Sequence, residues 1–365
     1  MQLYLHIPFC HRICPYCSFY KHTPGNTDMR AFIDAILLEA KHHVQQTGKN
    51  KLTTLYCGGG TPSMLSPTHL RLLFDGLHDT FDFSEIKELT FEANPATFEL
   101  KKAQLFKQLG ISRISLGIQS FDNTVLKTLG REHNRVEAME AVPILREAGI
   151  PQVNIDLMFS IPGQSLESWQ DTLDTAVSLQ PDHISAYNLT YEEDTAFIDK
   201  LTAGEYIDDP ETNAKFFTAA HETLTAADFE HYETSNYAKR GTRSTHNASY
   251  WSGANYLGLG PSAVSTIGTT RWKNLPDTAN YIKQISHVGH AKTEIEELDA
   301  EALHLERIAL ELRTIDGLDL SILTLEERQR AQSVIDEHMA SIQNGRMILT
   351  EKGMLLVDSI VEHIV

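Results

Sequence analysis

The stretch Leu3-Tyr-Leu-His-Ile-Pro8, followed by Cys10-His-Arg-Ile-Cys14-Pro-Tyr-Cys17, joins a short apolar run to three closely spaced cysteines. A short run of branched apolar residues is typical of a buried β-strand. Parallel α/β folds carry their functional side chains just beyond the carboxyl ends of such strands. The opening of the chain therefore indicates a first strand with a functional loop behind it.

Apolar runs and helical patterns alternate along the first half of the chain. The further runs cover residues 52–57, 88–93, 113–118, 153–159 and 183–189, and the helical patterns cover 28–48, 66–80, 98–109, 134–148 and 165–179. Several runs are almost continuous in Ile, Leu and Val, which suits parallel strands buried on both faces. Six βα units with right-handed crossovers predict an α/β fold, in which a parallel sheet curves into a partial (β/α)6 barrel.

The second half of the chain departs from this alternation. Residues 231–265 are rich in Tyr, Asn, Ser and Gly, which predicts loop with short strands. Helical patterns at 299–313 and 324–342 precede an apparent hairpin near 346–357, which predicts a small C-terminal α+β module. We expect three parts: a core at 1–228, a distinct segment at 229–290 and a winged-helix-like module at 291–365.

The composition is that of a globular protein, and it argues against several classes of binding partner. Of the 365 residues 41% are apolar and 22% charged, and no apolar run approaches the ~20 residues of a membrane helix. The N-terminus has no basic segment before its apolar residues, so it does not resemble a signal peptide. A formal net charge of −18 argues against nucleic acid and anionic membrane surfaces, which bind through Lys and Arg. We expect a cytoplasmic protein with no membrane span.

Three of the four cysteines form the pattern C-x3-C-x2-C at Cys10, Cys14 and Cys17. Clustered thiols without a wider cysteine framework favour a metal over disulfides. Three thiolates can ligate three irons of a [4Fe-4S] cluster and leave the fourth iron open to a small molecule. The alternative is zinc, held by the same cysteines and a histidine such as His6 or His11, although structural zinc prefers two ligand pairs from separate loops.

The residues around the cysteines resemble the radical S-adenosylmethionine (SAM) superfamily. The strings Tyr4-Leu-His-Ile-Pro-Phe-Cys10 and Pro15-Tyr-Cys-Ser-Phe19 are similar to its oxygen-independent coproporphyrinogen III oxidase branch, and most of all to the HemW-type haem chaperones of that branch. The resemblance covers about residues 2–320. It implies that the three cysteines hold a [4Fe-4S] cluster whose open iron binds SAM. It also implies an electron donor, because an electron from the cluster can cleave SAM.

Further motifs follow the predicted strands and should meet at one rim of the sheet. Bare glycine backbone lets a ligand approach closely, and an arginine can fork two hydrogen bonds to a carboxylate. The resemblance implies a SAM site made of Tyr4, Gly58, Gly59, Gly60, Thr61, Glu92, Gln119, Arg131 and Asp156. From the residues alone, the glycines equally suit a tight turn, the two acids structural ion pairs and the arginine a solvated surface.

Two departures separate this chain from the oxidases that it resembles. Those enzymes carry a cysteine where this chain has Phe19, and a longer N-terminal arm that we expect to be absent here. His246-Asn-Ala-Ser-Tyr250-Trp251 matches the HNxxYW motif of the haem chaperones, whose histidine is a candidate ligand of haem iron. The resemblance therefore implies binding of haem or a related tetrapyrrole and its delivery to an acceptor protein. The alternative function is that of an oxygen-independent coproporphyrinogen III dehydrogenase. From the residues alone, without the resemblance, His246 would be interpreted as an ordinary surface histidine.

Overall fold

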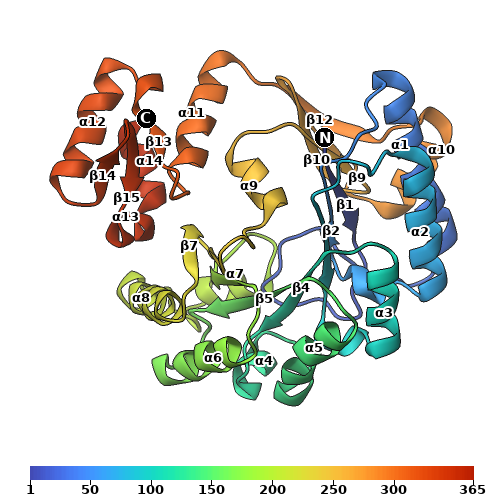
Figure 1. Ribbon diagram of the computed structural model, residues 1–365, viewed down its shortest axis with the longest axis horizontal. Helices are drawn as coiled ribbons and strands as arrows, with labels where there is room; N and C mark the ends of the chain where they lie inside the picture. Colours follow the sequence, from blue (N-terminus) through green and yellow to red (C-terminus); the bar gives the residue numbers. More distant parts are fainter.

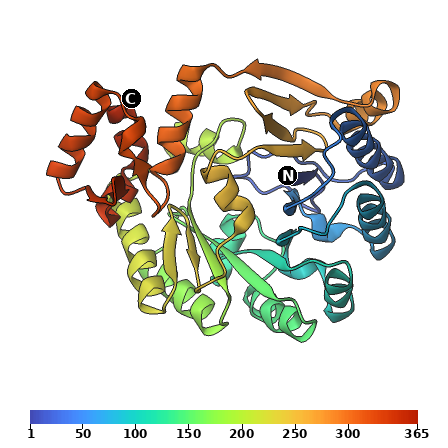
Figure 2. The ribbon, with the colours of Figure 1, turned by 45° about the horizontal axis from the view of Figure 1, so that its top comes forward.

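The computed structural model describes residues 1–365 and sets six parallel strands side by side in chain order (Figure 1). The strands are β1 (Gln2–Ile7), β2 (Thr54–Gly59), β3 (Glu88–Ala93), β4 (Arg113–Gln119), β5 (Gln152–Phe159) and β6 (His183–Asn188). The helices between them are α1 (Met29–Thr47), α2 (Pro67–Thr80), α3 (Leu100–Gln108), α4 (Asn123–Thr128), α5 (Arg135–Glu147) and α6 (Leu166–Ser178). They cover the outer side of the curved sheet (Figure 2), which confirms the predicted partial (β/α)6 barrel.

Local sequence signals explain where these helices begin and end. The Asp28 carboxylate accepts hydrogen bonds from the backbone N–H groups of Arg30 and Ala31 at the start of α1, and Gly48 ends that helix with a φ of 65°. Asn134 and Glu137 form a capping box at the start of α5. Such a cap stabilises a helix by about 0.5–2 kcal/mol relative to alanine, so the helix boundaries follow from short-range chemistry.

Six further strands extend both edges of this sheet to twelve strands. Next to β6 lie β8 (Asn236–Ala238) and β7 (Glu230–Glu233), and next to β1 lie β9 (Tyr256–Leu259), β10 (Val264–Ile267), β11 (Thr270–Asn274) and β12 (Lys292–Glu297). The helices of this part are α7 (Ala196–Thr202), α8 (Pro210–Ala226), α9 (Thr245–Trp251) and α10 (Thr278–Val288). The short strands expected within residues 231–265 are present, and the open edges of the parallel sheet offer them pairing partners. The helix α9 in the same stretch was not expected. The division at residues 228 and 290 stays a prediction.

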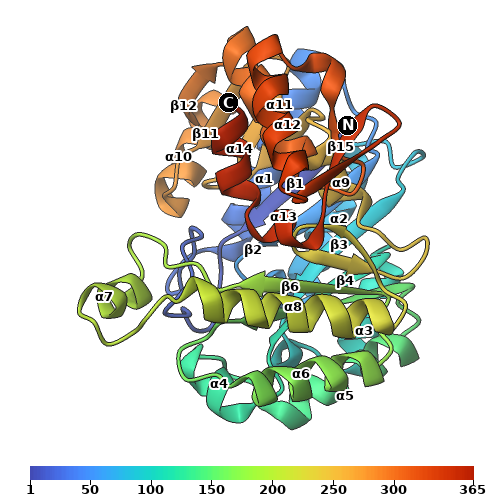
Figure 3. The ribbon, with the colours of Figure 1, turned by 90° about the vertical axis from the view of Figure 1, so that its left-hand side faces the viewer.

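The C-terminal residues form the expected small α+β module, which lies beside the barrel (Figures 1 and 3). Its elements are α11 (Ala300–Glu311), β13 (Leu318–Asp319), α12 (Leu325–Asp336), β14 (Ala340–Gln343), β15 (Arg346–Leu349), α13 (Glu351–Leu355) and α14 (Val357–Ile364). The hairpin lies earlier than predicted, and α12 is correspondingly shorter. Asn344 and Gly345 both take positive φ, 50° and 78°, which is the geometry of a two-residue hairpin turn.

The main apolar cluster runs from β1 through the barrel and into the C-terminal module, and a second, small cluster includes Val125 of α4 and Phe197 of α7. The helix α11 joins the two regions, since it contacts α9 on one side and α14 on the other. None of the helices combines the length and the apolar character that crossing a membrane requires.

Candidate functional site

A cavity of about 550 Å³ lies at the carboxyl ends of the parallel strands. Of the predicted site residues, it is lined by Tyr4, Cys10, Cys14, Cys17, Gly59, Gly60, Thr61, Glu92, Gln119, Arg131 and Asp156. Tyr4 lies in β1 and Arg131 between α4 and α5, while the others lie on the loop behind β1, in β2–β5 or just after these strands. The fold thus brings together side chains more than 100 positions apart. Gly58 lies beneath this surface, and His246 lies outside it.

The three cysteines are free thiols on the loop that follows β1, and all three are partly exposed. Backbone hydrogen bonds from Cys10 N to His22 O (3.1 Å) and from His22 N to Pro8 O (2.8 Å) close this loop on itself. Burial raises the pKa of Cys10 and of Cys17. No group of three or more His, Cys, Asp or Glu side chains is arranged around a point that could hold a single metal ion.

The glycine segment at the end of β2 lies against the start of the chain and against Glu92. Tyr56 donates its hydroxyl to Glu92 Oε1 (2.7 Å), and the N–H of Gly59 donates to Oε2 (3.1 Å). A Cβ at Gly58 would lie 2.7 Å from Glu92 Oε1, so the carboxylate fits only against bare backbone. Burial raises the pKa of Glu92 to about 7, and the Asp156 carboxylate acts in the same direction.

Asp156 is held from both sides by side chains of the sheet. Ser115 donates to its Oδ2 (2.8 Å), and the amide of Asn154 donates to its Oδ1 (2.7 Å). Burial raises the pKa of this carboxyl as well. Gln119 reaches the same cavity because β4 slips in register against β5 at this point, with Gln119 at a φ of 69°.

Arg131 connects the cysteine loop to the strand ends. Its Nη2 donates to Asn94 Oδ1 and to the carbonyl of Gly117, both at 2.6 Å, and its Nη1 lies 3.6 Å from Cys14 Sγ. The Nε of Arg131 is buried and has no partner in the chain. An unpaired guanidinium N–H inside a cavity is a donor available to a bound anion. On the other side, Thr61 places its hydroxyl 3.6 Å from Cys10 Sγ.

The structure also adds residues that the sequence did not single out. Tyr56, Ser115 and Asn154 position the two carboxylates, and Tyr187 lines the cavity. Their signal in the sequence was weak: each is a polar residue within an otherwise apolar strand. Such residues are recognisable only when the strand register shows which face they share.

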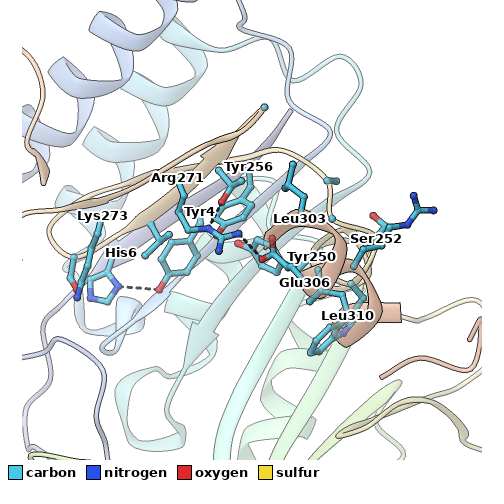
Figure 4. A pocket seen from close by; sticks show the side chains of 18 of the residues that line it. Tyr4, His6, Tyr250, Ser252, Tyr256, Arg271, Lys273, Leu303, Glu306 and Leu310 are labelled. Atoms are coloured by element: carbon cyan, nitrogen blue, oxygen red, sulfur yellow. Dashed lines mark hydrogen bonds and ion pairs between the residues drawn. The ribbon is translucent and has the colours of Figure 1, made fainter. Parts of the chain in front are cut away.

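A second cavity, of about 940 Å³, adjoins the first, because Tyr4, Ser18 and Phe19 line both. Its other walls come from α9, from β9–β11 and from α11 (Figure 4). Tyr250 and Trp251 of the HNxxYW motif line this larger cavity.

His246, at the start of the same motif, faces the sheet and is fully buried, with 0% exposure. Its Nδ1 pairs with Thr54 Oγ1 (2.8 Å) and its Nε2 with the Tyr250 hydroxyl (2.9 Å). Burial lowers its pKa to about 4, so the ring is neutral. It is not a surface histidine, and both of its ring nitrogens are engaged within the chain.

Residues 4–176 match the model of the Radical SAM superfamily. The chain is 34% identical over 98% of its length to the heme chaperone HemW of Mycobacterium tuberculosis, covering 93% of that protein. It is 30% identical over 98% of its length to the mitochondrial radical S-adenosyl methionine domain-containing protein 1 of Bos taurus, covering 82% of that protein. The crystallised coproporphyrinogen III oxidase HemN of Escherichia coli shares the fold, with a TM-score of 0.86 at 23% identity, covering 100% of this chain and 89% of that one.

The chain belongs to the HemW family of the radical-SAM superfamily. Membership of this superfamily implies a [4Fe-4S] cluster and SAM. The smaller cavity fits such a pair: it has three thiols on one wall, and on the others an unpaired arginine N–H, bare glycine backbone and two hydrogen-bonded carboxylates.

Proposed function

We propose that this protein is a haem chaperone, which binds haem or a closely related tetrapyrrole and transfers it to an acceptor protein. The observation that carries the proposal is the similarity, over nearly the whole chain, to proteins named as heme chaperones. The larger cavity supports it, because its volume lies within the range of about 300–1,000 Å³ that is typical of ligand sites, and aromatic side chains suit a flat macrocycle. We place this function in the cytoplasm.

In this proposal Cys10, Cys14 and Cys17 hold the [4Fe-4S] cluster. The SAM site consists of Tyr4, Gly58, Gly59, Gly60, Thr61, Glu92, Gln119, Arg131 and Asp156. The cluster, when bound and reduced by an electron donor, supplies the electron that can cleave SAM. The free Nε of Arg131 is suited to a carboxylate, and the bare backbone at Gly59 and Gly60 allows close contact. Glu92 has lone pairs left to accept hydrogen bonds from hydroxyl groups.

His246 is the proposed haem-iron ligand, and its surroundings define what ligation requires. The ring must first exchange its hydrogen bonds with Thr54 and Tyr250, and α9 must turn it from the sheet toward the cavity. Each exchanged hydrogen bond costs on the order of 1 kcal/mol. Tyr250 lines the larger cavity, and His246 precedes it by four residues, about one helical turn. The histidine therefore lies one turn of α9 away from the cavity.

The test is a haemin titration of the anaerobically reconstituted protein, followed by the Soret band, beside an assay with coproporphyrinogen III, SAM and reductant. We expect saturable haemin binding and no protoporphyrinogen IX. Formation of that product at catalytic turnover would identify a coproporphyrinogen dehydrogenase instead. A protein that does not bind haemin would also overturn the proposal.

The same titration tests His246. We expect His246→Ala to shift the Soret band and to weaken haemin binding at unchanged iron and sulfide content, while His287→Ala, at an exposed position of α10, leaves both unchanged. An unaltered band and affinity in His246→Ala would show that this side chain only anchors α9 to the sheet.

A further inference from the structure

One part of the larger cavity is lined by aromatic side chains. Six aromatic side chains line it: Tyr4, Phe19, Tyr20, Tyr250, Trp251 and Tyr256. Tyr250 and Tyr256 meet edge to face, with ring centroids 4.7 Å apart, and Figure 4 shows both of them beside Tyr4 and Arg271. The Nε1 of Trp251 is buried without a hydrogen-bond partner. A wall of this kind suits a large, flat and mostly apolar ligand.

Two cations face the same cavity from alternate positions of β11. Side chains two residues apart in a strand share a face and lie about 7 Å apart along it. Arg271 and Lys273 both line the cavity, whereas Trp272 between them is buried on the other face of the strand. The charges of the chain sum to −18, yet this lining has three cationic side chains against two acidic ones.

Both cations keep hydrogen-bonding capacity for a ligand. Arg271 donates its Nε to Thr266 (3.1 Å) and its Nη2 to Glu306 on α11 (2.5 Å), which leaves the Nη1 group free. The Nζ of Lys273 lies 3.9 Å from Glu294, beyond hydrogen-bond range. A ligand with two carboxylates on one edge could therefore pair with both side chains without displacing the Arg271–Glu306 contact.

We infer that the larger cavity is the haem site, with the macrocycle against the aromatic wall and its two propionates on Arg271 and Lys273. This inference rests on the proposed function and adds where in the protein the haem binds. Haem carries its two carboxylates on one edge of a flat apolar ring, which matches two neighbouring cations beside an aromatic wall. Because Tyr4, Ser18 and Phe19 line both cavities, the haem lies directly beside the proposed cluster and SAM site.

The propionate contacts are tested with haemin and its dimethyl ester, which differ only at the two carboxylates. Both ligands are titrated into the reconstituted wild type, into Arg271→Gln/Lys273→Gln, and into the control Arg30→Gln/Lys283→Gln. The control removes the same charges at exposed positions, and it too breaks an ion pair, that of Arg30 with Asp34 (2.9 Å).

We expect the wild type and the control to prefer haemin over the ester by roughly 10- to 100-fold for each carboxylate contact, since hydrogen bonds to charged groups are worth about 1.5–3 kcal/mol. In Arg271→Gln/Lys273→Gln this preference should fall to nearly one, because the variant loses the groups that distinguish the two ligands. The comparison is a ratio within each protein, so a general loss of stability does not imitate it.

A second variant tests the place of the ring. Val264 on β10 lines the cavity, and Val264→Trp should fill it and weaken binding of both ligands at least tenfold, while Val136→Trp, at an exposed site on α5, should not. Iron and sulfide contents report whether each variant is folded. An unchanged preference for haemin in Arg271→Gln/Lys273→Gln, or unweakened binding by a folded Val264→Trp, overturns this location while leaving the chaperone function intact. Absence of haemin binding by the wild type overturns both.

Discussion

Glu88 anchors the helix that carries the HNxxYW motif, and its removal should be among the most damaging single changes in this protein. The carboxylate is 4% exposed. It accepts hydrogen bonds from Arg113 Nε (3.2 Å), Ser244 Oγ (3.0 Å) and the backbone N–H groups of Thr245 (2.9 Å) and His246 (3.1 Å). It therefore neutralises a buried guanidinium and caps the start of α9 at once.

The expected magnitude follows from these contacts. Removing one partner of a buried ion pair leaves the other charge uncompensated and costs about 3–5 kcal/mol. Two unpaired N–H groups at a buried helix start add to this cost. The backbone carbonyl groups of Thr242 and Arg243 accept hydrogen bonds from Arg113 Nη2. These bonds remain in the variant and reduce the cost of removing the carboxylate. We therefore expect Glu88→Ala to lower the free energy of unfolding by about 4 kcal/mol, a large share of the roughly 5–15 kcal/mol of a typical domain.

The assay is urea unfolding of the protein without cofactors, followed by circular dichroism. Asp34→Ala, which removes the exposed ion pair with Arg30 (2.9 Å), is the matched control and should cost less than about 1 kcal/mol. Glu88→Gln keeps an acceptor and should fall between the two. If Glu88→Ala unfolds at the same urea concentration as Asp34→Ala, the buried pair does not anchor α9 and the reasoning fails.

Three further predictions concern the smaller cavity. Replacing all three cysteines of the triad by alanine should abolish reconstituted iron and sulfide. Cys57→Ala should retain them, because that thiol is fully buried in the core. A cluster retained in the triple variant would contradict the assignment of these cysteines as its ligands. Arg131→Ala and Asp156→Ala should weaken SAM binding, seen as loss of the SAM-induced change in the EPR spectrum of the reduced cluster, by roughly 10- to 100-fold relative to Arg30→Ala. Burial raises the pKa of Glu92 from 4.5 to about 7, so the folded state binds more protons than the unfolded state in this range and stability falls as pH rises from about 4.5 to 7. Glu92→Gln should remove up to roughly 3 kcal/mol of that fall. If the urea midpoint of Glu92→Gln varied with pH just as that of the wild type does, the raised pKa of Glu92 would be refuted.

Much of the barrel was predictable because its signals are local. Buried parallel strands require apolar runs, and helices require a 3.6-residue period and capping residues. The predicted helix at 134–148 differs from α5 by only one residue at each end, and the capping box of Asn134 and Glu137 explains why. Polar residues that follow parallel strands converge by topology, which predicted that the glycine segment and Gln119 share one rim. The grouping of Arg131 and Asp156 with them was implied by the family resemblance of the sequence, and both residues line the same cavity.

Other features were decided only by contacts between distant parts of the chain. The edge strands β7–β12 are only three to six residues long, and they form because the parallel sheet offers them a partner. The orientation of His246 depends on Thr54 and Glu88, more than 150 positions away. The larger cavity exists because α11 lies across from β9–β11, which brings Glu306 to Arg271. No local pattern encodes such a pairing, since burial and charge compensation across the fold are settled only when the elements pack. The sequence alone thus determined the barrel, the cysteine loop and the rim of the smaller cavity, while tertiary packing decided where the motif histidine points and where a larger ligand can fit.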